Sequence, residues 1–300
     1  MPITLPPISR RRFLATSLAT GAGLLLRPAF LAAAEADPHR LALLSDVHID
    51  ADPAAIDRQV VMYDHLKETI AQVGRLEPKP LAAFINGDCA HLLGRPEDYE
   101  MLVELLKPLR EQGLPIHLSM GNHDNRDNLW KTIPKAESHE GPLKDRQVAI
   151  IELARANVFL LDSLQKTNVT PGVLGEAQVD WLGAALDAHI TKPAIVMVHH
   201  QPDDRPKPDG LTDTKALLDV LSPRKHVKAL FFGHTHKWEI TSRSGIHCVN
   251  LPAVAYPFQK DQPTGWVDAY LREDGINLEL HCIDPMHPKH GQRVDLTWRA

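Results

Sequence analysis

The chain has 300 residues, of which 43% are apolar, 24% charged and 5% aromatic, and its formal net charge is −5 at pH 7. This composition predicts a soluble globular protein that can bury a large core, and the acidic balance argues against nucleic acid or an anionic membrane as its partner. The 17 histidines, many of them in short clusters, are unusual and direct attention to metal binding.

The first 36 residues have the features of an export signal. The run SRRRFL at 9–14 is followed by a weakly apolar stretch and by Ala-Glu-Ala at 34–36, an A-x-A cleavage pattern. A transmembrane anchor is the alternative, but the apolar run is shorter than the ~20 residues of a spanning helix and is broken at Arg27. The segment resembles a twin-arginine signal peptide over 1–36. This resemblance implies the twin-arginine translocation machinery as a partner, a periplasmic or secreted location without membrane attachment after cleavage, and one domain over 37–300.

Strand and helix patterns alternate through the first half of this domain. Short apolar runs predict buried strands at 40–45, 81–86 and 114–119, and helical spacing predicts helices at 54–74 and 96–112 between them. Strands that alternate with helices at this spacing indicate βαβ units and a mainly parallel sheet.

The second half of the domain has a different pattern. Two neighbouring apolar runs, 147–153 and 157–162, predict an antiparallel hairpin. From Trp238 onward, short alternating runs predict an antiparallel meander. The elements expected between these two regions are a helix at 174–189, a strand at 194–198, a helix at 213–221 and a strand at 227–232.

The three cysteines lack the C-x-x-C spacing of a metal site. Cys89 is expected to be a packed small residue. In an oxidising compartment Cys248 and Cys282 could form a disulfide, although sequence alone does not determine the pairing.

Polar clusters follow five of the predicted strands. They are Asp46-Val47-His48, Gly87-Asp88, Gly121-Asn122-His123-Asp124, His199-His200 and Gly233-His234-Thr235-His236. Any one of them alone would be read as a turn or as surface residues. Because ligands bind at the carboxyl ends of strands in open α/β sheets, we expect the five clusters to converge on one site.

The residue types in these clusters indicate metal chemistry. Aspartates, histidines and one asparagine form a mixed nitrogen and oxygen ligand set that suits Mn, Fe or Zn, whereas calcium would take nearly all its ligands from oxygen. The ligands are too many for one ion. With one bridging carboxylate they fit two ions ~3.5 to 4 Å apart, the separation found in two-metal hydrolases.

The motifs D-x-H, G-D, G-N-H-D, a single His after a strand and G-H-x-H, in this order, resemble those of the calcineurin-like metallophosphoesterases. The resemblance implies an α/β fold, a four-layer α/β/β/α sandwich with two mixed sheets and a dinuclear metal site at the carboxyl ends of the strands. The ligands that it implies are Asp46, His48 and His236 for one ion, Asn122, His199 and His234 for the other, and Asp88 as the bridge. His199 is preferred to His200 because the family's ligand comes immediately after the strand.

By the same resemblance, His123 would bind no metal. It would face the substrate and stabilise charge on the phosphoryl group or protonate the leaving oxygen, with Asp124 orienting its ring. Two divalent ions would leave the site attractive to an anionic phosphate ester and would lower the pKa of water from 15.7 towards ~7. The resemblance thus implies in-line attack by a metal-bridging hydroxide.

Two details narrow the resemblance. His91 occupies the place where purple acid phosphatases have a tyrosine, so their colour is not expected. His91 is either a contact near the site or an ordinary loop residue.

The helix pattern L-G-x-x-Q-x-x-W-L at 174–182 looks more like the branch with bacterial cyclic-nucleotide and glycerophosphodiester phosphodiesterases. We therefore predict an exported phosphodiesterase that acts on a small-molecule phosphate ester. A phosphomonoesterase at the same site and a non-catalytic metal-binding protein on this scaffold are the alternatives.

Overall fold

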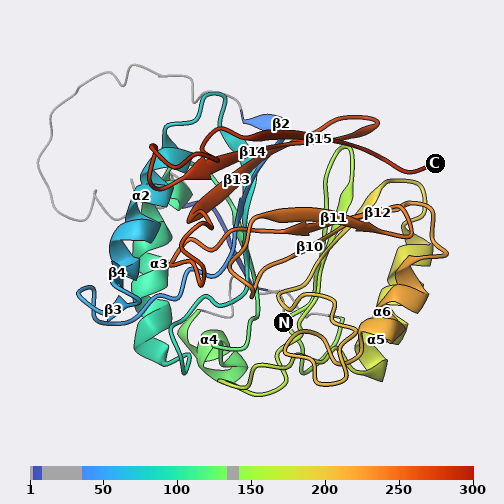
Figure 1. Cartoon of the computed structure of the whole chain (residues 1–300), viewed down its shortest axis with the longest axis horizontal. Helices are drawn as coiled ribbons and strands as arrows, with labels where there is room; N and C mark the ends of the chain where they lie inside the picture. Colours follow the sequence, from blue (N-terminus) through green and yellow to red (C-terminus); the bar gives the residue numbers. More distant parts are fainter. Residues whose placement is uncertain (1–2, 9–35, 134–141) are drawn as a thin grey trace, which may run out of the picture.

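Two β-sheets pack face to face, with helices on the outer side of each, in the computed structural model of the protein (Figure 1). The structure describes residues 3–8, 36–133 and 142–300. The predicted α/β fold, a four-layer α/β/β/α sandwich with two mixed sheets, is confirmed.

The first sheet contains the strands predicted in the first half of the domain. Its strand order is β1-β6-β5-β2-β13-β14-β15, in which β2, β5 and β6 are parallel and the other neighbours are antiparallel. The strands are β1 (Ile3–Leu5), β2 (Asp37–Leu44), β5 (Pro80–Asn86), β6 (Ile116–Ser119), β13 (Gly265–Leu271), β14 (Gly275–Cys282) and β15 (Arg293–Thr297). Helices α2 (Met62–Gly74) and α3 (Pro96–Glu111) cover its outer face, and the short helix α4 (Arg126–Thr132), which was not predicted, follows β6.

The second sheet has the order β11-β12-β10-β9-β8-β7. Its strands are β7 (Ala149–Glu152), β8 (Asn157–Leu160), β9 (Ala194–Met197), β10 (Val227–Phe232), β11 (Glu239–Arg243) and β12 (Ile246–Asn250). The predicted hairpin is confirmed as the antiparallel pair β7–β8. Helices α5 (Glu176–Ala188) and α6 (Thr214–Leu221) pack on the outer face of this sheet, as expected from their apolar spacing.

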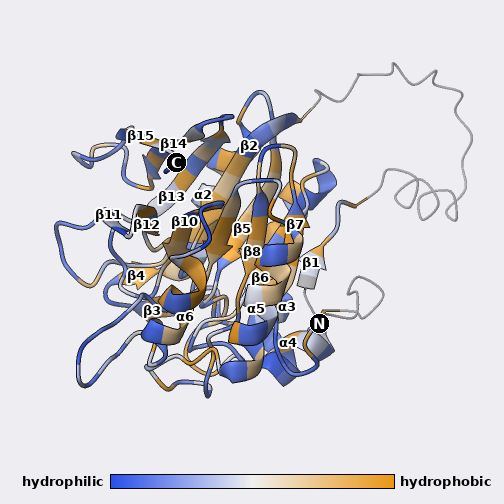
Figure 2. Ribbon diagram, turned by 90° about the vertical axis from the view of Figure 1, so that its right-hand side faces the viewer, coloured by the Kyte–Doolittle hydropathy of each residue, from blue (hydrophilic) through white to orange (hydrophobic). Residues whose placement is uncertain are grey.

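The side chains of β2 explain why its sequence is continuously apolar. Leu41 and Leu43 pack between the two sheets, whereas Ala42 and Leu44 pack outward beneath α2 and α3. Successive residues of a strand face opposite sides, so a strand covered on both faces is apolar throughout. Figure 2 shows the result, with hydrophobic strands inside and hydrophilic residues on the outer helices. Burial of each leucine side chain contributes roughly 1.5–3 kcal/mol, and this packing fixes where the strands end.

Two predicted elements are wrong. The helix expected over 54–74 begins only at Met62, because its first part forms a two-stranded hairpin of β3 (Ile56–Asp57) and β4 (Val60–Val61). The side chain of Val60 packs against a cluster of Met62, Ala255 and Tyr256, of which the last two are far away in the sequence, and this tertiary packing outweighs the helical pattern. The meander expected after Trp238 divides between the sheets: β11 and β12 join the second sheet, with β12 parallel to β10, while β13, β14 and β15 join the first.

Residues 3–8 lie within the predicted signal peptide and contact the domain. β1 pairs antiparallel with β6, and the side chain of Leu5 is buried in the core under α3. Residues 9–35 lie outside the described residues, so the signal peptide over 1–36 stays a prediction. In the part of the chain that the structure describes, no helix is long and apolar enough to cross a membrane.

All three cysteines are buried and free. Cys248 lies in the core under α5 and α6, whereas Cys282 lies in the core between the sheets. The disulfide left open by the sequence is therefore not formed, because the two thiols belong to different layers.

Candidate active site

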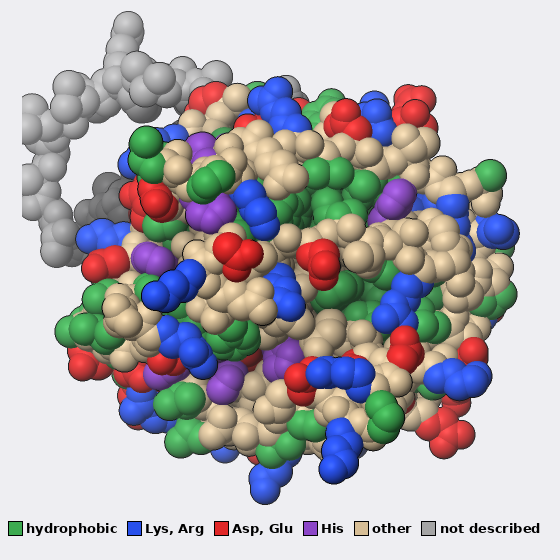
Figure 3. Space-filling model, viewed as in Figure 1, with side chains coloured by type: hydrophobic (Ala, Val, Ile, Leu, Met, Phe, Trp, Pro, Cys, Tyr) green, Lys and Arg blue, Asp and Glu red, His purple; other side chains and the backbone are tan. Residues whose placement is uncertain are grey.

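The predicted site residues meet at one end of the sandwich. Loops after β2, β5 and β6 of the first sheet and after β9 and β10 of the second carry them. Their candidate ligand atoms form three overlapping groups, in each of which the atoms lie within 4.8 Å of one another: Asp46, His48 and His236; His48, Asp88 and His123; and Asp88, His199 and His234. A cavity of about 480 Å³ adjoins them, with Asn122 in its lining. Figure 3 shows histidine side chains at several places on one face of the molecule, some of them beside charged side chains on its lower part.

Two buried carboxylates form the centre of the site. Asp46 and Asp88 are at most 1% exposed, and their oxygens face imidazole nitrogens rather than water. The Nε2 atom of His199 lies 3.2 Å from Asp88 and 3.9 Å from Asp46, and the Nε2 atom of His236 lies 3.3 Å from Asp46. Buried carboxylates require a compensating positive charge, so this centre must hold protons or metal cations.

Backbone carbonyls orient three of the imidazole rings. The bonds are His199 Nδ1 to Asn86 O (2.9 Å), His236 Nδ1 to Tyr256 O (2.5 Å) and His234 Nε2 to Asp209 O (3.1 Å). A neutral ring that donates its N–H to a carbonyl presents a lone pair on its other nitrogen, and in His199 and His236 that other nitrogen, Nε2, faces the carboxylates. Metal-binding histidines characteristically use their second nitrogen in this way.

The electrostatics of the centre also fit cations. Burial opposes protonation of His199, but the carboxylates of Asp88 and Asp46 outweigh it and raise its pKa to about 10. Burial lowers the pKa of His48 to about 3, which favours a neutral ring with a free lone pair. The amide oxygen of Asn122 and His199 Nε2 are buried without a hydrogen-bond partner. Metal ions would satisfy these atoms and replace the proton on His199.

The backbone is strained at the same residues. Five predicted ligands have left-handed conformations, with φ of 52° at Asp46, 46° at His48, 48° at Asp88, 68° at His234 and 53° at His236. Each such residue costs roughly 1–3 kcal/mol, and such residues cluster at functional sites. The neighbouring Gly121 must lack a side chain, because a Cβ atom there would lie 2.1 Å from Asp88 Oδ1.

Residues 39–238 match the family model described as calcineurin-like phosphoesterase. The chain belongs to this family. It is thereby a metal-dependent phosphoric ester hydrolase, and its clustered carboxylates, imidazoles and amide are suited to the two metal ions that the family uses.

Relatives of this phosphoesterase include phosphodiesterases. A probable cyclic nucleotide phosphodiesterase of Synechococcus is 27% identical over 81% of this chain and 92% of its own length. The 3′,5′-cyclic adenosine monophosphate phosphodiesterase CpdA of Pseudomonas aeruginosa is 28% identical over 73% of this chain and 77% of its own. A probable glycerophosphodiester phosphodiesterase of Arcobacter nitrofigilis is 27% identical, with coverages of 84% and 98%. A dimetal phosphatase from Danio rerio shares the fold, with a TM-score of 0.64 at 16% identity, 87% coverage of this chain and 99% of that one.

His123 lies at the edge of the phosphoesterase site, but Asp124 does not touch its ring. The Nδ1 atom of His123 lies 3.3 Å from the carbonyl oxygen of Leu92. Asp124 is fully buried and accepts hydrogen bonds from the backbone N–H groups of Cys89, Ala90 and Gly121 and from the Tyr99 hydroxyl. The prediction that Asp124 orients the His123 ring is therefore wrong. A buried carboxylate is satisfied by the nearest backbone donors, so Asp124 instead joins the two loops that carry Asp88 and Asn122.

Two further histidines take different places. His200 lies behind His199, with its Nδ1 atom 2.7 Å from the Ser163 hydroxyl, and it belongs to none of the three ligand groups. His91 lies between two carboxylates, with ring nitrogens 3.3 Å from Asp50 and 3.3 Å from Asp57. His91 thus links the loops beside His48 and is not a bare loop residue.

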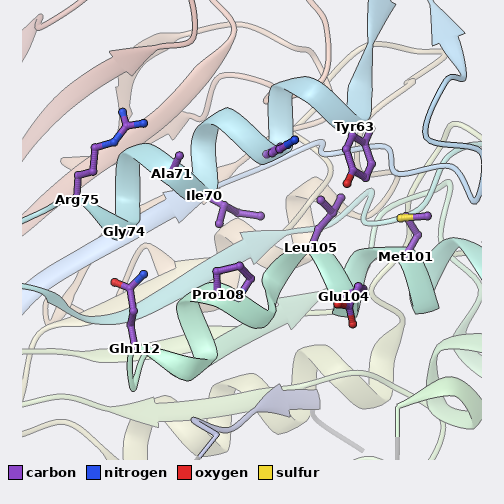
Figure 4. A pocket seen from close by; sticks show the side chains of 11 residues that line it. Tyr63, Ile70, Ala71, Gly74, Arg75, Met101, Glu104, Leu105, Pro108 and Gln112 are labelled. Atoms are coloured by element: carbon purple, nitrogen blue, oxygen red, sulfur yellow. The ribbon is translucent and has the colours of Figure 1, made fainter.

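Sequence reasoning missed two aromatic residues at the site. The ring of Tyr256 stacks on His48, with centroids 5.2 Å apart, and the ring of Phe258 stacks on His236 at 4.0 Å. The only signal was the run YPF at 256–258 within a segment without strand or helix pattern. A second cavity of about 510 Å³ lies between α2 and α3 (Figure 4), but it contains none of the predicted site residues.

Proposed function

We propose that this phosphoesterase is an exported dinuclear-metal phosphodiesterase that hydrolyses a small-molecule phosphate diester. The observation that carries the proposal is the convergence of five strand-end clusters into one buried, oriented ligand set beside an open cavity. The names of its relatives support a diester rather than a monoester, because cyclic nucleotide and glycerophosphodiester phosphodiesterases both act on diesters.

The proposed ligand assignment follows the groups of side chains. Asp46, His48 and His236 would hold one ion, Asn122, His199 and His234 the other, and Asp88 would lie between them. Mn, Fe or Zn would suit this mixture of oxygen and nitrogen donors. When bound, such ions neutralise charge on a phosphate ester and lower the pKa of water, which supplies a nucleophile near neutral pH.

The remaining site groups would act on the substrate. A hydrogen bond from His123 Nδ1 to the Leu92 carbonyl would leave Nε2 free to interact with the phosphoryl group or the leaving oxygen. Correct placement of His123 matters because proton transfer requires hydrogen-bond distance to the leaving oxygen.

Export is the second part of the proposal. The SRRRFL run and the A-x-A pattern at 34–36 support recognition by the twin-arginine machinery, cleavage after Ala36, and a periplasmic or secreted mature protein. N-terminal sequencing of the protein recovered from a twin-arginine-competent host and from a translocation-deficient host would test it. The same intact N-terminus in both hosts would contradict it.

Activity is tested by hydrolysis of bis(p-nitrophenyl) phosphate and p-nitrophenyl phosphate with added Mn²⁺, before and after chelation. We expect metal-dependent turnover with preference for the diester. Turnover of the monoester alone would indicate a phosphatase, and turnover of neither would favour a non-catalytic metal-binding protein.

Three variants test the roles of the site residues. Asp88→Ala should lose both metal content and activity, whereas His123→Ala should keep its metal and lose roughly 10²–10⁴-fold in kcat. His247→Ala, on β12 away from the site, is the matched control. Full activity of His123→Ala would remove the proposed role of His123.

A further inference from the structure

An arginine that forms no salt bridge with any described residue lies beside the proposed metal centre. Arg58 is exposed at the tip of the β3–β4 hairpin, and it forms no hydrogen bond or ion pair with any residue in the described ranges. Its guanidinium carbon lies over two aromatic rings instead, 4.8 Å from the centroid of Phe258 and 5.6 Å from that of Tyr256. Cation–π contacts of this kind hold a guanidinium in place and leave its N–H groups available.

The hairpin that carries Arg58 is fixed in position. The Oδ2 atom of Asp57 lies 3.3 Å from His91 Nε2. Arg58 and Gln59 form the two-residue turn of the hairpin, and both have left-handed backbones, with φ of 48° and 68°. A two-residue hairpin turn requires this conformation at both residues, so the tight turn fixes where Arg58 leaves the hairpin.

The aromatic rings connect Arg58 to the metal centre. Phe258 stacks on His236 at an interplanar angle of 11°, and Tyr256 stacks on His48 at 19°. Both histidines belong to the ligand group that contains Asp46. Arg58 is therefore one ring layer away from these proposed ligands.

Charged side chains of both signs line the cavity. Lys237, next to His236 in the sequence, lines the cavity together with Phe258 and, like Arg58, has no hydrogen bond or ion pair within the described part of the chain. Arg205, which also lines the cavity, contacts the carboxylates of Asp203 and Asp209. Among the described residues, Arg58 over the Phe258 ring and Lys237 in the same lining as Phe258 are therefore two cations without a salt bridge.

We propose that Arg58 and Lys237 form an anion subsite that binds a second anionic group of the substrate, several bonds away from the scissile phosphate. The inference rests on the proposed phosphodiesterase function and narrows its substrate class to diesters that carry a further phosphate or carboxylate. A guanidinium presents a planar fork of donors that matches such groups, and the nearby ammonium adds charge. The scissile phosphate itself would remain at the metal centre.

The test compares two chromogenic esters that differ by one phosphate. They are thymidine 5′-(p-nitrophenyl phosphate) and its 3′-phosphorylated form, assayed with the Mn²⁺-loaded full chain. We expect the wild type to prefer the 3′-phosphorylated ester by roughly 10-fold in kcat/KM, through KM, with a preference that falls as salt screens the charges. In the double variant Arg58→Gln/Lys237→Gln the preference should disappear, while kcat/KM for the singly anionic ester and the metal content stay within about twofold.

Matched variants separate the subsite from general effects. Arg75→Gln, which removes an exposed arginine of α2, should keep the preference, and Arg58→Lys should keep part of it. Equal kcat/KM for the two esters in the wild type, or an unchanged preference in the double variant, would overturn the subsite. Equal losses on both esters in the double variant would overturn it too, because they would show general electrostatic attraction.

A binding measurement distinguishes failure of the subsite proposal from failure of the proposed phosphodiesterase function. Calorimetric titration of the Mn²⁺-loaded protein with thymidine 5′-phosphate and thymidine 3′,5′-bisphosphate needs no turnover. If neither ester were hydrolysed, the phosphodiesterase function would be rejected, and the titration would still decide the subsite. The subsite is supported if the wild type binds the bisphosphate more tightly than the monophosphate and the double variant does not. Equal Kd values of the two nucleotides in the wild type contradict the subsite.

Discussion

Replacement of Asp124 by asparagine tests whether this residue acts on His123 or on the backbone of the site. One carboxylate oxygen accepts from the N–H groups of Cys89 (3.1 Å) and Gly121 (2.9 Å), and the other from Ala90 (3.1 Å) and the Tyr99 hydroxyl (3.1 Å). Asparagine has the same shape but presents an NH₂ group in place of one oxygen. At least one buried backbone N–H must then lose its acceptor.

The magnitude follows from the number and type of these bonds. A hydrogen bond to a charged acceptor contributes roughly 1.5–3 kcal/mol, and an unsatisfied buried donor adds a desolvation cost of ~1–3 kcal/mol. We expect Asp124→Asn to lose about 3–5 kcal/mol of unfolding free energy, because one or two such bonds are lost. In a domain of this size that loss lowers the Tm by roughly 10 °C. Metal affinity should fall roughly 10–100-fold, because Asp124 positions the loops of the proposed ligands.

The measurement is urea unfolding and Mn²⁺ titration at pH 8. Burial and the nearby Asp88 raise the pKa of Asp124 to about 6, so the carboxylate is ionised at that pH. Tyr99→Phe keeps the three backbone bonds to Asp124. It removes one donor to the carboxylate and the acceptor of the Asn125 backbone N–H (2.7 Å), so it should cost roughly 1.5–3 kcal/mol, less than Asp124→Asn. If Asp124→Asn kept its stability and metal affinity and lost only kcat, Asp124 would act on His123 after all.

Three other predictions address different parts of the molecule. A chain that begins at residue 37 lacks β1, and loss of buried Leu5 should lower the unfolding free energy by roughly 1.5–3 kcal/mol relative to the full chain; equal urea midpoints would contradict this. Burial lowers the pKa of His117 from 6.5 to about 4. The stability that goes with its neutral ring is fully present above pH 6.5, and the free energy of unfolding falls by about 3 kcal/mol as the pH falls to 4, because the unfolded chain binds the proton first. The stability difference between wild type and His117→Phe should change over that window and be flat above it. Gly121→Ala should reduce Mn²⁺ affinity at least 10-fold, because its Cβ would lie 2.1 Å from Asp88 Oδ1; unchanged affinity would show that the loop can move.

The positions where the strands end could be predicted from sequence, because an apolar run stops there and a polar cluster begins. The strand 81–86 is apolar up to Asn86, and Gly87-Asp88 follow it. One such polar turn is ordinary, but five of them after predicted strands indicate a shared site. The rule that parallel strands present their carboxyl ends at one edge then places Asp88 near Asp46 without coordinates.

What could not be predicted depends on contacts between distant segments. The helical spacing at 54–61 is real, but packing of Val60 against the cluster that contains Ala255 and Tyr256 selects a hairpin. The direction of Asp124 depends on which donors are nearest, and those donors belong to the loop after β5. The carbonyls that orient the histidines leave no mark in the sequence, because every residue has a carbonyl.

The position of the metal centre has a mechanical consequence. Its side chains come from loops after β2, β5 and β6 on one half of the sandwich and after β9 and β10 on the other. Elsewhere the halves meet through apolar side chains, which can slide, whereas a coordinated cation fixes both partners at once. Loaded ions would therefore join the halves, and chelation should let them separate locally, with faster amide exchange at this end of the molecule than at the opposite one.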